Sequence, residues 1–205
     1  MSDLSDEDLA RLFRQGDRGA FELIYEAHRA QVFDYLSALA GDRAMGEDLF
    51  RETFLELARR RGEYVGRPPF AIWLYRLARE RADARLGRPQ AEQGNVIYLR
   101  SRVSTPEDEE VDLVNRDAEG SGDSHRLLQG RALRARVAEV VAELPRPGRD
   151  VLVLSLWQGR EAAQVAAILD LSEGAVGSQL HQAYGCLLDL MQPYLRRMDG
   201  QEGVG

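Results

Sequence analysis

The sequence has few of the residues that disulfide and metal chemistry need. Cys186 is the only cysteine, so an internal disulfide or a cysteine metal cluster is excluded, and a single thiol fits a reducing cytoplasm. The three histidines, His28, His125 and His181, are scattered along the chain. There is also no carboxylate pair, no nucleophile-base spacing and no phosphate-binding glycine loop. We therefore expect no metal, no cofactor and no enzyme activity.

Long apolar runs and lysine are absent as well. No run of about 18 apolar residues occurs, so we expect no membrane insertion. The first six residues are acidic and lack the basic-then-apolar order of a signal peptide. All 27 basic residues are arginine, which we attribute mainly to genomic base composition. These features predict a cytoplasmic protein.

The net charge of −7 is unevenly distributed along the chain. Residues 91–125 carry nine acids against three arginines, whereas residues 1–90 carry 16 acids against 15 arginines. Residues 126–205 carry nine of each sign. The middle segment is also polar and rich in glycine, proline and serine, which predicts an acidic flexible linker.

On both sides of this linker, apolar residues recur at the spacing of amphipathic helices. The apolar fraction of 44% is enough for packed cores. The sequence therefore predicts an all-α fold with two small helical domains, residues 1–90 and 126–197, joined by the acidic linker 91–125. Residues 198–205 are expected to form a disordered tail.

The second domain contains the pattern of a helix-turn-helix. Two helices, at about 161–169 and 173–191, are joined by Asp170-Leu171-Ser172. Asp170 falls where the turn requires positive φ, which aspartate tolerates better than most residues. Ser172 is a good N-cap for the second helix.

Several separate motifs together are similar to those of one family. They are Gly16-Asp17 with Ala20-Phe21, Gly46-Glu47-Asp48-Leu49 with Arg51-Glu52, Trp73-Leu74-Tyr75-Arg76-Leu77-Ala78-Arg79, and Leu144-Pro145 followed by Gln164-Val165-Ala166. Their order and spacing resemble the extracytoplasmic-function (ECF) sigma factors of bacterial RNA polymerase. The resemblance covers roughly residues 4–90 and 127–192.

The resemblance implies three binding surfaces and their partners. The first domain, sigma-2-like, would bind core RNA polymerase and melt promoter DNA, and the second would be a sigma-4-like helix-turn-helix. A probable anti-sigma or other regulatory protein is a further implied partner. The implied core-polymerase residues are Asp48, Leu49, Arg51, Glu52 and Phe54. The residues implied for the start-proximal promoter element are Trp73, Arg76, Arg79, Arg81, Arg85 and Arg88, and those for the upstream element are Ser172, Ser178, Gln179 and Gln182.

The charge pattern supports nucleic-acid binding by the first domain. Residues 59–88 contain nine arginines against three acids, a net charge of +6, interleaved with Trp73 and Tyr75. Arginines neutralise phosphates, and aromatic faces stack on unpaired bases, as a separated promoter strand requires. The alternative interpretation is that Trp73 belongs to the core and the arginines solvate an exposed helix.

The sequence also departs from the family pattern. Arg51 stands where the family usually has Gln, and Glu80 where it usually has Asn. Between residues 161 and 195 there is no Arg or Lys, whereas the family's second helix usually carries several. Three hypotheses follow: a sigma factor that binds its upstream element weakly and relies on tethering to polymerase, a sigma-derived regulator or adaptor that acts by protein contacts, and an enzyme.

Overall fold

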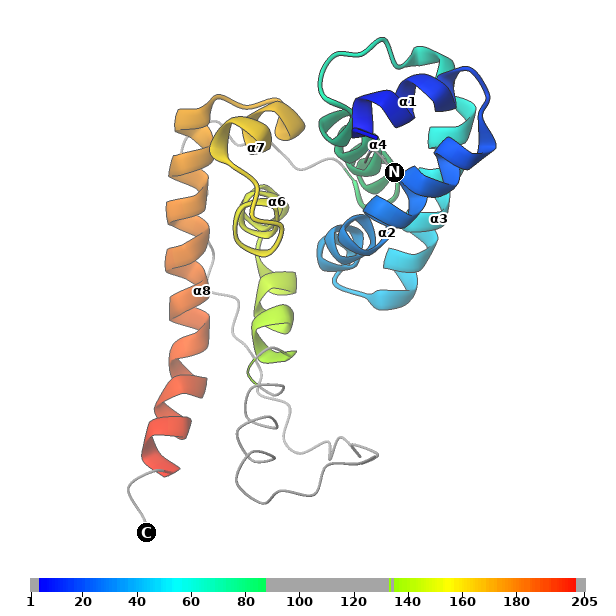
Figure 1. Cartoon of the computed structure of the whole chain (residues 1–205). Coiled ribbons are helices and arrows are strands. Elements are labelled where there is room, and N and C mark those ends of the chain that lie inside the picture. Colours follow the sequence, from blue (N-terminus) through cyan, green and yellow to red (C-terminus); the bar gives the residue numbers. More distant parts are fainter. Residues whose placement is uncertain (1–3, 88–132, 134, 202–205) are drawn as a thin grey trace.

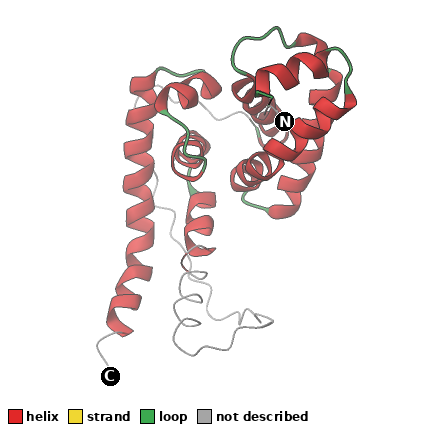
Figure 2. Ribbon diagram, viewed as in Figure 1, coloured by secondary structure: helices red, strands yellow, loops and turns green. Residues whose placement is uncertain are grey.

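The computed structural model describes residues 4–87, 133 and 135–201, and the regular elements within these ranges are all helices (Figures 1 and 2). The prediction of an all-α fold is confirmed. The acidic linker 91–125, Arg88 and the tail residues 202–205 lie outside the described residues.

The first domain consists of four α-helices and one 3-10 turn. These are α1 (Asp6–Arg14), α2 (Arg18–Ala40), α3 (Arg43–Arg59), η1 (Arg61–Glu63) and α4 (Phe70–Leu86). Acceptor side chains cap the first three helices: Ser5, Asp17 and Asp42 accept backbone N–H groups of Asp8, Ala20 and Met45 at 3.2, 3.1 and 2.7 Å. Each cap satisfies an N–H group that has no partner within its helix.

The core of the first domain lies where these four helices meet. Ile24, Leu36, Leu49 and Leu74 are fully buried there, as the helical spacing of apolar residues predicts. Gly46 allows α3 to cross α2 closely, because a Cβ at this position would lie 2.4 Å from the Ser37 hydroxyl oxygen. Any larger residue at this crossing would push the two helices apart.

The second domain begins with residues 135–143, which are helical. It continues with α6 (Arg146–Leu152), the π-helical turn η2 (Val153–Trp157), α7 (Ala162–Leu169) and α8 (Glu173–Gln201). Both α6 and α7 pack against α8, and Val151, Val165 and Val176 are buried between them. α6 thus runs directly into the π-helical turn η2.

The turn between α7 and α8 has the predicted helix-turn-helix geometry. Asp170 adopts the left-handed conformation with φ 58°, and the Ser172 hydroxyl accepts the backbone N–H of Ala175 at 3.2 Å. α8 differs from the expectation in its length, because it continues through Pro193 to Gln201 instead of ending near residue 191.

The two domains are in contact in this structure. In Figure 1, α6 and α7 lie between the long helix α8 and the helices of the first domain. α4 packs against α7, and α2 packs against α6 and η2. Among the residues that the structure describes, no helix is both long and apolar enough to cross a membrane.

Candidate nucleic-acid and protein interfaces

Helix α4 carries the arginines that the sequence indicates for nucleic-acid binding. Its first turn is anchored by an aromatic cluster in which the Trp73 ring lies 5.3 Å from that of Tyr64 and 5.9 Å from that of Phe70. Trp73 is only half-buried, so part of its surface remains available beside the arginines. This side chain therefore contributes to the core and also borders the basic surface.

The first two arginines of α4 bind the helix-turn-helix. Arg76 Nε donates a hydrogen bond to the Ala167 carbonyl at 2.7 Å, and Arg79 Nη1 donates to the Leu169 carbonyl at 2.7 Å. Both carbonyls belong to the last turn of α7, where carbonyls lack partners within the helix and the helix dipole is negative. These hydrogen bonds hold both guanidinium groups against the end of α7, although each uses only one of the five N–H donors of its arginine.

On this surface, the other arginines that the structure describes lie beside carboxylates. Arg81 Nη2 lies 3.1 Å from a Glu80 oxygen, and Arg85 Nη1 lies 3.1 Å from a Glu52 oxygen. Partial burial raises the pKa of Glu80, but hydrogen bonds from Arg60 and Arg81 outweigh it and hold that pKa below its usual value. Ion pairs at a protein surface contribute at most about 1 kcal/mol, so a phosphate can replace these partners.

A charge cluster joins α4 to α6 across the contact between the domains. Each helix supplies one arginine and, four residues later, one aspartate: Arg79 and Asp83 on α4, Arg146 and Asp150 on α6. Arg146 Nη2 lies 2.8 Å from Asp83 Oδ1 and 3.7 Å from Asp150 Oδ2. Arg79 Nε lies 4.0 Å from both an Asp83 and an Asp150 oxygen. We call these four residues the interdomain cluster.

Asp150 is the most deeply buried member of this cluster. Its side chain is fully buried, and neither carboxylate oxygen has a hydrogen-bond partner among the described residues. Burial raises the pKa of Asp150 to about 6, although the neighbouring arginines act in the opposite direction. A buried charge with incomplete hydrogen bonding is unfavourable, so the cluster holds the domains together less firmly than its number of charges suggests.

Further arginines of the second domain bind the first domain. Arg149 is substantially buried and donates to the carbonyls of Leu39 at 2.6 Å, Leu144 at 2.9 Å and Ala142. The Arg160 guanidinium lies over the Tyr75 ring, 4.7 Å from its centroid. The contact between the domains therefore combines these charged groups with buried apolar residues that form one continuous cluster across both domains.

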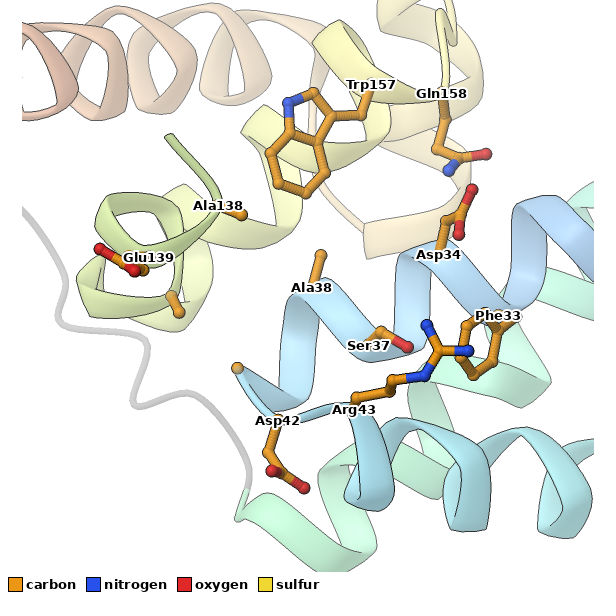
Figure 3. A pocket seen from close by; sticks show the side chains of 12 residues that line it. Phe33, Asp34, Ser37, Ala38, Asp42, Arg43, Ala138, Glu139, Trp157 and Gln158 are labelled. Carbon is orange, nitrogen blue, oxygen red and sulfur yellow. The ribbon is translucent and has the colours of Figure 1, made fainter. Parts of the chain in front are cut away.

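Two open clefts border the contact between the domains. Figure 3 shows a cavity with Trp157 and Gln158 on one side and Asp34, Ser37 and Ala38 of α2 on the other. Its volume is about 520 Å³. A second cavity of about 520 Å³ lies between Arg76, Arg79 and Asp83 of α4 and Ile168 and Asp170 of the second domain.

Helix α3 presents a mixed polar and apolar face. Asp48, Arg51 and Leu55 are exposed on it, and Arg51 pairs with Asp48 at 3.4 Å. Glu52 is half-buried and pairs with Arg85. Two of the residues indicated for polymerase binding, Leu49 and Phe54, are buried in the core, so they hold the helix in place and do not form its outer surface.

The helix-turn-helix presents polar groups without positive charge. Ser172 caps α8, and the Ser178 hydroxyl donates to the Gly174 carbonyl at 3.0 Å, so both hydroxyls already have backbone partners. Gln179 is half-buried, and Gln182 is exposed. Only Gln182, among the four residues indicated for the upstream element, is both exposed and without a backbone partner among the described residues.

Sequence reasoning did not identify the residues that join the domains. Arg146, Arg149 and Asp150, in and just after the segment that contains Pro145 and Pro147, were not singled out from the sequence for this role. One signal was available: the Arg-x-x-x-Asp spacing occurs in both α4 and α6, which places opposite charges on the same face of each helix. Leu55 of α3, which is exposed, was not among the residues indicated for polymerase binding.

Comparisons with known proteins agree with this architecture. Residues 24–88 match Sigma-70 region 2, and residues 134–187 match Sigma-70, region 4. The ECF RNA polymerase sigma factor SigL of Mycobacterium tuberculosis is 32% identical over 171 residues, which cover 80% of this chain and 84% of SigL. The RNA polymerase sigma-H factor of Pseudomonas aeruginosa is 24% identical over 93% of this chain and 96% of its own length.

A solved structure shares the fold. CnrH, in complex with the cytosolic domain of CnrY, aligns with a TM-score of 0.65 at 20% identity, covering 92% of this chain and 97% of that chain. The two matched regions and the helix-turn-helix define a sigma factor of the sigma-70 type. Within that class, the chain belongs to the ECF sigma factors, which direct promoter-specific transcription initiation by RNA polymerase.

Proposed function

We propose that this sigma factor divides its work unequally between its domains. The first domain supplies the contact with core polymerase and reads the start-proximal promoter element. The second domain adds little affinity for duplex DNA and, in the free protein, covers part of the first. The observation that carries this proposal is the pair of hydrogen bonds from Arg76 and Arg79 to the end of α7. We further propose that the protein acts in the cytoplasm and catalyses no reaction itself.

The promoter-reading role rests on the arginines of α4 and on Trp73. Once α7 moves away, Arg76 and Arg79 are free beside Arg81 and Arg85, whose partners are surface carboxylates. The half-exposed Trp73 at the start of the same helix offers an aromatic face to an unpaired base. This combination suits a single strand of separated DNA better than a duplex.

The polymerase-binding role rests on the outer face of α3. Asp48, Arg51 and Leu55 lie one turn apart along this face, which combines charges of both signs with an exposed apolar side chain. Interfaces commonly surround an apolar anchor with polar groups. The face lies on a helix anchored by Leu49 and Phe54, so its side chains are held on a rigid support.

The limited role of the second domain follows from its charge. Residues 161–195 carry four acids and no Arg or Lys, a net charge of −4. Phosphate contacts supply most of the non-specific affinity of DNA-binding proteins, and α8 has no cation to make them over this range. Tethering through the first domain and polymerase raises the local concentration, so a weak upstream contact can still contribute to promoter choice.

The packed arrangement implies that the domains separate before promoter binding. The hydrogen bonds to α7 hold Arg76 and Arg79 against the second domain, which limits the approach of a DNA strand to this part of α4. Binding of core polymerase would therefore favour the separated arrangement, whereas a protein that binds both domains together would favour the packed one. CnrH was solved with the cytosolic domain of CnrY, and we propose a regulatory partner for this chain as well.

Transcription with purified core polymerase tests this proposal. Arg76→Ala with Arg79→Ala should reduce initiation at least tenfold while core binding stays unchanged. Arg11→Ala with Arg14→Ala, which removes two exposed arginines of α1, is the matched control and should retain initiation. Initiation that survives the α4 substitutions would contradict the assigned role.

The adaptor hypothesis has one observation in its favour, the absence of positive charge on the helix-turn-helix. The same experiment separates the two functions. An adaptor would bind core polymerase without initiating transcription on any template of a random promoter library, whereas the sigma factor proposed here would initiate at specific sites.

A further inference from the structure

Arg60 belongs to the basic segment 59–88, yet its guanidinium is already held by two carboxylates. Its Nε donates a hydrogen bond to Glu63 Oε2 at 2.7 Å, and its Nη1 donates to Glu80 Oε2 at 2.8 Å. These two hydrogen bonds raise the pKa of Arg60, and only 29% of its side chain is exposed. Arg60 is therefore less available to a phosphate than the exposed arginines beside it in the sequence.

The three residues join three different elements of the first domain. Arg60 is the residue that ends α3, Glu63 lies in η1, and Glu80 lies on α4, 20 positions from Arg60 in the sequence. A backbone hydrogen bond adds to this connection, because the Glu63 N–H donates to the Arg60 carbonyl at 2.9 Å. We call Arg60, Glu63 and Glu80 the Arg60 brace.

The Arg60 brace holds both sides of the aromatic contact that supports Trp73. Tyr64 follows Glu63 directly and is buried, and its ring lies 5.3 Å from that of Trp73. On α4, Trp73 and Glu80 are seven residues apart, so they lie on the same face about two turns from each other. The brace thus fixes η1 at one end and α4 at the other, and Trp73 lies between these attachment points along the chain.

Glu80 also gives a physical meaning to a departure from the family pattern, in which this position usually has Asn. An asparagine side chain is shorter and uncharged, so it could not form the same ion pair with Arg60. The Glu80 carboxylate uses its other oxygen, Oε1, for Arg81 at 3.1 Å. A phosphate can therefore replace Glu80 at Arg81 while Oε2 stays bound to Arg60.

We propose that the three residues of the Arg60 brace are positioning residues, which hold Trp73 in the orientation that lets an unpaired base stack on its exposed part. This inference rests on the proposed function and adds the residues that support its aromatic contact. Glu63 and Glu80 then favour binding of a DNA strand despite their negative charge, because they act through the position of Trp73. Simple electrostatics predicts the opposite, since an acid on a DNA-binding surface repels phosphates.

The fluorescence of Trp73 in the full chain measures this effect. Trp157→Phe leaves Trp73 as the single tryptophan, and a base that stacks on it quenches its emission. The probe is a single DNA strand of mixed sequence, about 20 nucleotides long, which exceeds the site size of a typical single-strand binding fold. In this background, Glu80→Gln and Glu63→Gln should each reduce the quenching at saturation. Each should also lower the affinity by up to about fivefold, the most that a surface ion pair supports.

Glu56→Gln is the matched control, because it also removes one acid near the end of α3. The Glu56 carboxylate pairs with Arg59 at 3.6 Å and takes no part in the Arg60 brace. This variant should lower neither the quenching nor the affinity, and the melting temperatures of all three variants should stay close to that of the background. An affinity that rises in Glu63→Gln and Glu80→Gln would show that these acids only repel phosphates, and it would overturn the proposal.

Salt dependence separates positioning from direct contact. Arg60→Ala should lower the affinity without changing the slope of log affinity against log salt, because Arg60 neutralises no phosphate. A slope that decreases in magnitude by about 0.7 would assign a phosphate contact to Arg60 and contradict the proposal. Arg60→Ala combined with Glu80→Gln should lower the affinity no more than the stronger single variant, since both remove the same ion pair. Additive losses would mean that the two residues act separately, which the brace does not allow.

The same titrations distinguish a failure of the brace from a failure of the proposed function. If the strand does not quench Trp73 even with the brace intact, the base-stacking contact of the proposed function is wrong and the brace has no role in it. If the strand quenches Trp73 equally in the background and in Glu80→Gln, the stacking contact stands and only the brace is refuted.

Discussion

Removing the Arg146 side chain should open the contact between the domains. Arg146 is the one cation of the interdomain cluster that lies within 3 Å of a carboxylate, at 2.8 Å from Asp83. It also donates to the Gly87 carbonyl at 2.8 Å. In Arg146→Ala, the fully buried Asp150 keeps Arg79, at 4.0 Å, and Arg149 as its cationic neighbours. Separation of the domains would return these carboxylates to water.

The size of the expected destabilisation follows from the burial of the ion pair between Arg146 and Asp83. Breaking one partner out of a buried ion pair is destabilising by about 3–5 kcal/mol. Arg146 and Asp83 retain 11% and 17% side-chain exposure, so the lower end of that range applies. We expect Arg146→Ala to destabilise the packed state relative to the separated state by on the order of 3 kcal/mol. This shifts the equilibrium toward the separated state roughly a hundredfold.

Fluorescence energy transfer between the domains measures this equilibrium. Labels at Val65→Cys and Gln192→Cys, in a Cys186→Ser background, report on exposed sites of the two domains. Arg146→Ala should lower the transfer efficiency and raise the affinity for a single-stranded promoter oligonucleotide, because the population with free α4 arginines increases. Arg29→Ala, which breaks a surface pair with Glu26 inside α2, is the control. Transfer and affinity equal to wild type in Arg146→Ala would refute the reasoning.

Three further predictions follow from the same contacts. Because burial raises the pKa of Asp150 from 3.8 to about 6, the packed state binds a proton more tightly than the separated state, so packing should weaken as the pH rises from about 4 to about 6 and change little above about 7. The packed-to-separated equilibrium should change by roughly a hundredfold at most. Asp150→Asn, which leaves Arg79, Asp83, Arg146 and Arg149 in place, should flatten the curve of transfer efficiency against pH. An unchanged curve would show that another group titrates. Charge reversal at Asp48 should reduce core polymerase affinity at an unchanged melting temperature, since exposed substitutions alter stability by less than about 0.5 kcal/mol, whereas the same reversal at Asp17 removes an N-cap and should instead lower the melting temperature. For single-stranded DNA, log affinity against log salt should have a slope near −0.7 per phosphate neutralised, and Arg79→Ala, Arg81→Ala and Arg85→Ala together should flatten that slope if these side chains contact phosphates.

Local structure could be predicted well from the sequence because its causes are local. The helical spacing of apolar residues such as Leu36 and Leu39 of α2 indicates which helix faces are buried, and the structure confirms it. The left-handed turn at Asp170 and the cap at Ser172 depend on a few adjacent residues and were predicted as well. Gly46 is different, because only the structure shows that the backbone of α2 requires the missing side chain.

The contact between the domains could not be predicted because its partners are distant in sequence. Arg76 binds the Ala167 carbonyl 91 residues away, and a carbonyl acceptor leaves no trace in residue type. The charge of the basic segment 59–88 indicates nucleic acid, but the same arginines also suit the end of a helix. Likewise, Leu49 and Phe54 belong to a motif that the resemblance links to polymerase, although their burial gives them a supporting role.

Transcription from a random promoter library with core polymerase tests the division of work between the domains most directly. We predict specific initiation at promoters that share a start-proximal element and show little sequence preference upstream. Replacing Arg76 and Arg79 with alanine should remove the preference for the start-proximal element. Promoters selected mainly by an upstream element, with an indifferent start-proximal sequence, would contradict it.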